Sequence, residues 1–172
     1  LDPENAILYY NRALVYSAQG DLESAVAEFT VAVEVDPNLA IAYYNRGLTQ
    51  IDLGNVEQGL ADIDQAVGVD PENVFFLLNR SDIYRDQGLF DQSLTDLNTI
   101  IELEPENTQA YLSRGAIYIV APGLQDCEAA RNDWNTFLTF EPDAEQRPEI
   151  EALIGQLCPD VEPFDVPPTS EE

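Results

Sequence analysis

Lysine, histidine and methionine are absent from this sequence. Its seven basic residues are all arginine and face 33 acidic residues, which gives a formal charge of −26. Without histidine and lysine, the chain lacks the commonest general base, the commonest neutral metal ligand and a Schiff-base nucleophile. The acidity also argues against nucleic acid and anionic membrane surfaces as partners, because both would be repelled.

Long apolar runs and phosphate-binding loops are absent as well. No segment has the length of a membrane-spanning helix, and no signal-peptide pattern is present, so we expect no direct membrane insertion. No glycine-rich phosphate loop, calcium loop or histidine-based triad occurs. We therefore expect no enzymatic activity, no metal and no cofactor. Because residue 1 is not methionine, we expect an excised domain or a processed product of a longer protein.

The composition is nevertheless that of a folded protein, with 45% apolar and 9% aromatic residues. Two explanations of the acidity remain open. It can serve as a solvated outer face that keeps the protein soluble, including at high salt, or it can attract a basic partner.

A repeat of 34 residues organises the chain. The segments LDPEN, VDPNL, VDPEN and LEPEN place prolines at positions 3, 37, 71 and 105. Between the first two prolines, AILYYNRALVYSAQG keeps apolar residues at helical spacing and stops at Gly20, and DLESAVAEFTVAVEV stops before Pro37. Two helices of this length cannot bury their apolar faces alone, so neighbouring repeats must stack.

The periodicity defines four consecutive repeats: 6–39, 40–73, 74–107 and 108–143. The fourth has three extra residues near APGLQD. Residues 1–5 match the tail of a preceding repeat. Residues 144–158 predict an amphipathic helix that caps the last repeat, and residues 159–172, rich in proline and acid, predict a flexible tail.

Seven positions of each repeat follow one pattern of aromatic, small and proline residues. In the first repeat they are Tyr9, Ala13, Tyr16, Ala25, Phe29, Ala32 and Pro37. The second repeat departs from the pattern at Gln50 and Gly59. Over residues 1–143 the chain resembles the tetratricopeptide repeat family. The resemblance implies an all-α fold, a right-handed α–α superhelix (solenoid) of four helix pairs followed by the capping helix.

Four of the seven arginines recur at intervals of 34 residues: Arg12, Arg46, Arg80 and Arg114. An acid occupies one register of each second helix: Glu28, Asp62, Asp96 and, after the insertion, Asp133. The helical phase turns these arginines toward the second helices, so we expect a structural salt bridge between arginine and acid in every repeat. The alternative is a row of arginines that binds an anionic ligand.

The two cysteines, Cys127 and Cys158, lie 15 residues before and 16 residues after Pro142. They therefore fall at the same end of the hairpin formed by the last second helix and the capping helix. This arithmetic favours a disulfide over two unrelated buried thiols. A disulfide would favour an extracytoplasmic location, periplasmic, cell-surface or secreted, whereas free thiols would favour the cytoplasm.

In the tetratricopeptide repeat family, the first helices of successive repeats line a groove that holds peptides. The resemblance assigns the following residues to it: Tyr10, Asn11, Tyr44, Asn45, Leu48, Phe75, Leu78 and Asn79. The three asparagines form a row similar to the asparagine ladder of O-GlcNAc transferase, because an amide can pair with a peptide backbone. Two alternatives stay open: the asparagines bond within the array, and the aromatic residues bury against a neighbouring repeat or a second copy of the chain.

The leading hypothesis is a non-enzymatic scaffold that binds a peptide or protein segment in this groove, with the acidity favouring a basic partner. A structural or assembly role through self-association is an alternative. The array can also be the non-catalytic repeat domain of a larger enzyme.

Overall fold

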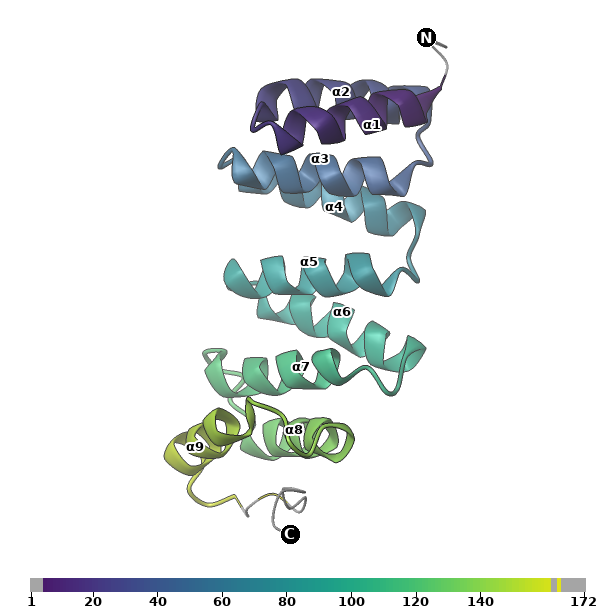
Figure 1. Cartoon of the computed structure of the whole chain (residues 1–172). Helices are drawn as coiled ribbons and strands as arrows, with labels where there is room; N and C mark the ends of the chain where they lie inside the picture. Colours follow the sequence, from purple (N-terminus) through teal and green to yellow (C-terminus); the bar gives the residue numbers. More distant parts are fainter. Residues whose placement is uncertain (1–4, 162–163, 165–172) are drawn as a thin grey trace. The chain divides into compact units, whose positions relative to one another are not determined.

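The computed structural model describes residues 5–161 and 164, and every regular element among them is an α-helix (Figure 1). The helices are α1 (Ala6–Ala18), α2 (Leu22–Val35), α3 (Ala40–Asp52), α4 (Val56–Val69), α5 (Val74–Asp86), α6 (Phe90–Leu103), α7 (Thr108–Val120), α8 (Cys127–Phe140) and α9 (Arg147–Leu157). The expected all-α fold of helix pairs followed by one further helix is confirmed. Residues 1–4 of the expected preceding tail, and residues 162–163 and 165–172 of the expected flexible tail, lie outside the described residues.

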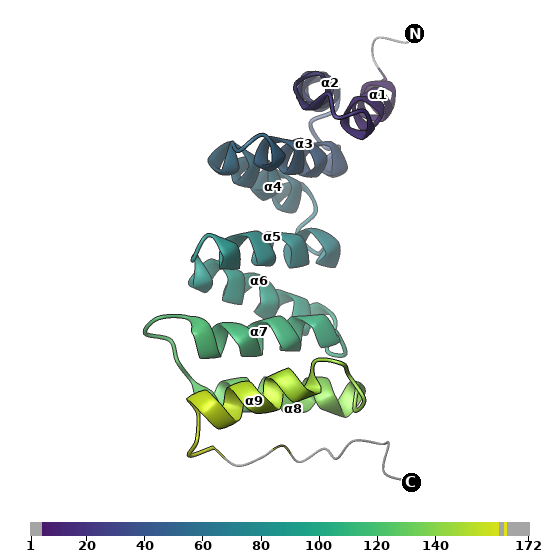
Figure 2. The same ribbon diagram turned by 60° about the vertical axis from the view of Figure 1, so that its left-hand side comes forward.

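The chain comprises two compact units, Leu1–Arg80 and Ser81–Glu172, with the division inside α5. In the first unit, α2 packs on α1 and on α3, and α3 packs on α4. In the second unit, α7 packs on α6 and on α8, and α9 lies alongside α8 (Figure 2).

Glycine and side-chain caps set the helix ends. Each first helix is followed by a glycine with positive φ: Gly20, Gly54, Gly88 and Gly123, at 72–85°. This left-handed conformation is unfavourable for residues with a Cβ atom, so glycine ends the helix and reverses the chain. At the start of two second helices, Asp21 and Asp126 accept hydrogen bonds from the backbone N–H groups of Ser24 and Ala129.

Close helix contacts explain why the second repeat departs from the family pattern at Gly59. A Cβ atom on Gly59 would lie 2.5 Å from the carbonyl oxygen of Gly47, and a Cβ atom on Gly47 would lie 2.7 Å from the carbonyl oxygen of Gly59. Helices α3 and α4 therefore touch through their backbones, and alanine at either position would push them apart.

The core of the second unit is built around Trp134, whose side chain is fully buried. Its indole Nε1 donates to the carbonyl oxygen of Leu112 at 3.0 Å, and Ile150 and Ile154 of α9 belong to the same cluster. Helix α9 thus covers apolar surface that α8 would otherwise expose.

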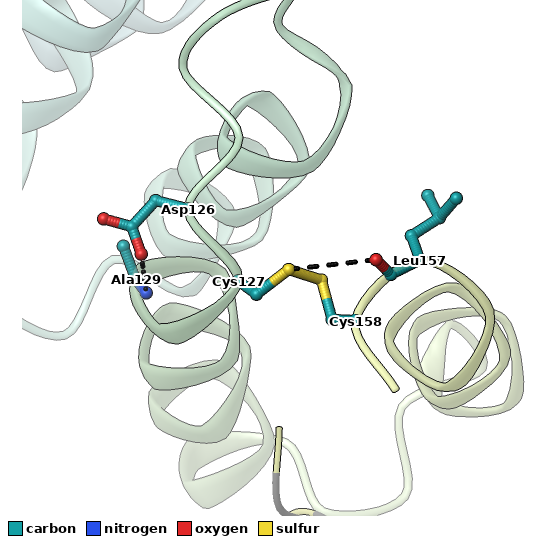
Figure 3. Close-up of a disulfide and its surroundings, with 5 residues drawn as sticks. All are labelled: Asp126, Cys127, Ala129, Leu157 and Cys158. Carbon is teal, nitrogen blue, oxygen red and sulfur yellow. Dashed lines mark hydrogen bonds between the residues drawn. A yellow bond between two sulfur atoms is a disulfide. The ribbon is translucent and has the colours of Figure 1, made fainter. Parts of the chain in front are cut away.

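The predicted disulfide between Cys127 and Cys158 is confirmed (Figure 3). The two Cα atoms are 5.7 Å apart, within the usual range for this bond. It joins the first residue of α8 to the residue after α9 and so fixes the end of α9.

Candidate binding surface

The residues that the sequence assigns to the groove all belong to the first unit, on α1, α3 and the part of α5 up to Arg80. We call this surface the first-helix face and define it by these residues together with Ile7 and Leu14 of α1. Two contacts join its helices. Asn45 Nδ2 on α3 donates to the Tyr10 hydroxyl on α1 at 3.2 Å, and the Tyr44 and Phe75 rings meet at 5.1 Å.

Tyr44 is buried, with 4% of its surface exposed. Its ring stacks on Phe76 at 5.0 Å and meets Phe75 edge-on, so the start of α5 covers it. The structure therefore shows burial of Tyr44 against the neighbouring repeat, one of the alternatives left open for the aromatic residues, while its contact with a ligand stays a prediction. This burial raises the pKa of the Tyr44 hydroxyl above its usual value.

Phe75 is the most exposed aromatic residue of this face, at 55%. Its ring is held at an interplanar angle of 60° to Tyr44, which forms its buried support. Ile7 and Leu14 are also exposed, and Leu48 and Leu78 are half-buried. The face therefore offers apolar surface to solvent on all three helices.

The asparagines of the face bond mainly within the array. Asn45 Nδ2 donates to the carbonyl oxygen of Ile41 at 2.9 Å as well as to Tyr10, and Asn79 Nδ2 donates to the carbonyl oxygen of Phe75 at 2.7 Å. Both donors of Asn45 are thus used, and its free group is the Oδ1 acceptor. Asn11 is exposed.

Tyr10 is half-buried and links α1 to two neighbours. Its ring lies 5.8 Å from that of Phe29, and its hydroxyl accepts from Asn45. Burial raises the pKa of the Tyr10 hydroxyl, and the hydrogen bond from Asn45 partly offsets this shift.

The arginine row is occupied by acids of the chain. Arg46 binds both carboxylate oxygens of Asp62 at 2.7 and 2.5 Å, and Arg114 binds Asp133 in the same way at 2.8 and 2.6 Å. The hydrogen bond to Asp133 raises the pKa of Arg114. This two-point geometry satisfies most of each guanidinium and leaves little for an anionic ligand.

The other two arginines differ from this pattern. Arg12 forms an ion pair with Glu28 through Nη2 at 2.5 Å, and the hydrogen bond that Arg12 donates to this carboxylate raises the pKa of Arg12. Arg80 binds Asp64 of α4 through Nη1 at 2.9 Å. Its pairing with Asp96 stays a prediction.

In Arg46, Arg80 and Arg114, the Nη1 atom donates to a residue in the second helix of the preceding repeat. Arg46 Nη1 donates to Thr30 Oγ1 at 3.3 Å, and Arg114 Nη1 donates to Asn98 Oδ1 at 2.6 Å. Together with Asp64, which binds Arg80, these acceptors are 34 residues apart. Sequence reasoning missed them, although a polar residue at one register of each second helix was a visible signal. The row therefore joins adjacent repeats as well as the two helices of one repeat.

Within the described part of the chain, no group of three or more acidic or cysteine side chains is arranged to hold a metal ion. No helix there has the length and apolar character needed to cross a membrane.

Comparison with known families gives two matching models. The model described as TPR repeat matches residues 14–54, and the model described as tetratricopeptide repeat matches residues 40–73 and 76–107. Together they cover more than half of the chain. A search of curated proteins found no match.

Several solved structures share the fold. A tetratricopeptide repeat protein from Parabacteroides merdae is 23% identical, with a TM-score of 0.82 over 90% of this chain and 60% of its own. MamA 41-end from Desulfovibrio magneticus is 16% identical, with a TM-score of 0.75 over 91% of this chain and 86% of its own. Pseudomonas aeruginosa pilF is 17% identical, with a TM-score of 0.67 over 90% of this chain and 68% of its own. The chain thus spans three fifths of the length of the Parabacteroides protein.

Proposed function

Because the chain belongs to the tetratricopeptide repeat family, whose members are in general protein-interaction scaffolds, we propose that it is a non-enzymatic scaffold that binds a peptide or protein segment on the first-helix face. The proposal rests mainly on Phe75. An aromatic ring that is 55% exposed yet braced by a buried tyrosine is a preorganised apolar anchor, because little side-chain freedom is lost when a partner covers it.

The other exposed apolar residues extend this anchor along the face. Ile7 and Leu14 on α1 are 48% and 38% exposed, and Leu48 on α3 is half-buried. A bound segment that places apolar side chains over these positions would remove their surface from water.

Polar groups beside the apolar residues would orient the segment. Asn11 is exposed, and Asn45 presents an acceptor because both of its donors are used inside the array. Backbone N–H groups of a peptide fit such an acceptor. Asn45 therefore pairs with a ligand as an acceptor only.

The charge of the chain favours a basic partner. A formal charge of −26 raises the association rate of positively charged segments and repels acidic ones, and this effect weakens with salt. The disulfide is consistent with location of the protein in an oxidising compartment outside the cytoplasm.

An array of short synthetic peptides with mixed apolar and basic residues would test the proposal. Binding of the best peptide to the whole chain is then measured by fluorescence anisotropy. We expect Phe75→Ser to weaken binding by about tenfold or more, as is usual for a central aromatic anchor. Val69→Ser, which alters an exposed apolar residue on α4, a second helix of the same unit, is the control.

Equal affinities of Phe75→Ser and the parent chain would refute the site. The alternative role in self-association predicts a dimer. The measured molar mass would then rise with protein concentration, and Phe75→Ser would dissociate the dimer. Light scattering after gel filtration separates the two.

A further inference from the structure

A second exposed apolar surface lies in the second unit. It contains Leu89, Leu124 and Leu157, which are 37%, 37% and 41% exposed, and we call these three residues the leucine ledge. Leu89 and Leu124 line one open depression of about 430 Å³, and Leu124 and Leu157 line another of about 640 Å³. Both depressions share Gly123 and Leu124, so the three leucines border one continuous stretch of surface.

Leu89 occupies a position that is polar in the other three second helices, where Asp21, Asn55 and Asp126 stand. It is the N-cap of α6, and it makes no side-chain hydrogen bond to the helix. At the equivalent position of α2 and α8, Asp21 and Asp126 each accept a backbone N–H. Leucine cannot cap a helix in this way and here remains exposed rather than buried. Capping therefore does not explain the residue.

Leu124 and Leu157 are brought to the same place by the insertion in the fourth repeat and by the helix that follows it. Leu124 lies in the segment that holds the three extra residues, directly after the turn at Gly123. Leu157 is the last residue of α9 and precedes Cys158. Figure 3 shows how the disulfide fixes it: the Sγ atom of Cys127 lies 4.0 Å from the carbonyl oxygen of Leu157. Because that sulfur has no proton, this is a packing contact.

The charges around the ledge are of one sign. The residues that line the two depressions include Asp91, Asp126 and Glu128 and no basic residue. Asp126 caps α8, whereas Asp91 and Glu128 are exposed in the first turns of α6 and α8. An apolar strip edged by carboxylates complements a segment that has both apolar and cationic side chains.

The same charges disfavour the chain itself as occupant. The sequence of residues 162–172, EPFDVPPTSEE, is acidic and has no basic residue, and a second copy would bring another charge of −26. Like charges brought together at an interface oppose association.

We propose that the leucine ledge is a second docking site, for a segment of another protein in which leucine-like side chains alternate with lysine or arginine. Its residues all belong to the second unit, and the proposal does not depend on the function proposed for the first-helix face.

The probe is a short fluorescein-labelled peptide of alternating leucine and lysine, titrated with the whole disulfide-bonded chain and followed by anisotropy. The matching peptide of leucine and glutamate controls for charge. We expect Leu89→Asn and Leu124→Asn each to weaken binding of the leucine–lysine peptide by about tenfold. Leu103→Asn, which is 39% exposed in the same unit but outside both depressions, is expected to change little.

Leu89→Asn also separates binding from folding. Asparagine is a favoured N-cap residue, so the variant is expected to unfold at the same or a higher temperature than the parent chain while it loses the peptide. A residue with only a structural role would show the opposite, lower stability and unchanged affinity.

Three results would overturn the proposal. If Leu103→Asn and Leu89→Asn weakened binding of the peptide equally, the peptide would be attracted to the acidic surface in general. The same conclusion would follow if neither variant weakened binding. Loss of the peptide with Phe75→Ser alone would place it on the first-helix face, so the ledge would fail while the function proposed above stands. A concentration-dependent dimer that Leu89→Asn dissociates would make a second copy the occupant.

Discussion

Arg46 donates from Nε and Nη2 to both carboxylate oxygens of Asp62, at 2.7 and 2.5 Å, within one helix pair. Its remaining Nη1 donates to Thr30 in the second helix of the preceding repeat, at 3.3 Å. The guanidinium lies over the Tyr43 ring at 5.5 Å, and 18% of the side chain is exposed. One side chain therefore connects three helices of the first unit.

Replacing Arg46 by methionine is expected to destabilise the first unit by about 2 kcal/mol. This value lies between the roughly 0–1 kcal/mol of an exposed ion pair and the roughly 3–5 kcal/mol for breaking a fully buried one. The reason is that the Asp62 carboxylate, whose side chain is 14% exposed, would lose both of its hydrogen bonds from Arg46. Urea unfolding followed by circular dichroism measures the change.

Arg85→Ala serves as the control for this prediction. Among the described residues, Arg85 pairs only with Asp82 and Asp86 of its own helix, and its side chain is 33% exposed, so its loss is expected to cost less than about 1 kcal/mol. Equal costs for Arg46→Met and Arg85→Ala would show that the arginine row does not hold the repeats together.

Gly115→Ala is expected to destabilise the second unit although alanine is the better helix former. A Cβ atom at this position would come within 2.6 Å of Trp134 Nε1, and this indole is fixed by its bond to Leu112. We expect a loss of about 1–3 kcal/mol from overpacking. Fluorescence of Trp134, the single tryptophan, reports the unfolding.

Gly68→Ala tests whether that loss comes from the contact with tryptophan. A Cβ atom on Gly68 of α4 meets no atom within 4 Å, so this variant is expected to gain up to about 1 kcal/mol from helix propensity. If Gly115→Ala were also stabilising, the indole would have to move more freely than the packing indicates.

Reduction of the disulfide is expected to lower the stability of the second unit by about 2–4 kcal/mol, since Cys127 and Cys158 are separated by 31 residues. Thermal unfolding with and without reductant, followed by Trp134 fluorescence, measures the difference. The unreduced chain is expected to take up no thiol reagent, and labelling of both cysteines before reduction would contradict the bond.

Tyr44→Phe is expected to change stability only at alkaline pH. Burial raises the pKa of Tyr44 in the folded protein above its usual value of 10.0, so the unfolded chain loses this proton first. The stability that the protonated hydroxyl contributes is present below pH 10 and falls as pH rises from there through the raised pKa. Phenylalanine cannot ionise and avoids this loss.

The test compares urea midpoints of the parent chain and Tyr44→Phe at pH 7 and above pH 10. Similar midpoints at pH 7, with the variant more stable at high pH, would support burial of Tyr44. Parallel pH curves would show that the hydroxyl is exposed to water in the folded state.

The features that repeat could be predicted from the sequence, because stacked repeats place every thirty-fourth residue in a similar environment. This regularity explains why Arg46 and Asp62, or Arg114 and Asp133, could be paired from their register alone. The disulfide followed from helix length, since two helices that meet at one turn return to the same level after equal numbers of residues.

Features that depend on the size of one neighbouring side chain could not be predicted in this way. Tyr44 is buried because Phe76 stacks on it, and the equivalent positions of the second and fourth repeats hold the small residues Ala42 and Ala110. The sequence does not show whether the asparagines bond within the array or to a ligand, because an amide in a helix can bond to the carbonyl four residues earlier as readily as to a ligand. Leu89 was overlooked, although its equivalents Asp21 and Asp126 are polar.

The link from Arg46 back to Thr30, and the same link from Arg114 to Asn98, changes what counts as one module of this protein. A cut at the prolines would separate each arginine from its acceptor in the helix before. The piece that could be moved between proteins with its bonds intact starts at a second helix and runs through the helix pair that follows. Recombination or design that respects this longer block should preserve the stack, whereas exchange of single 34-residue repeats would have to match the acceptor as well.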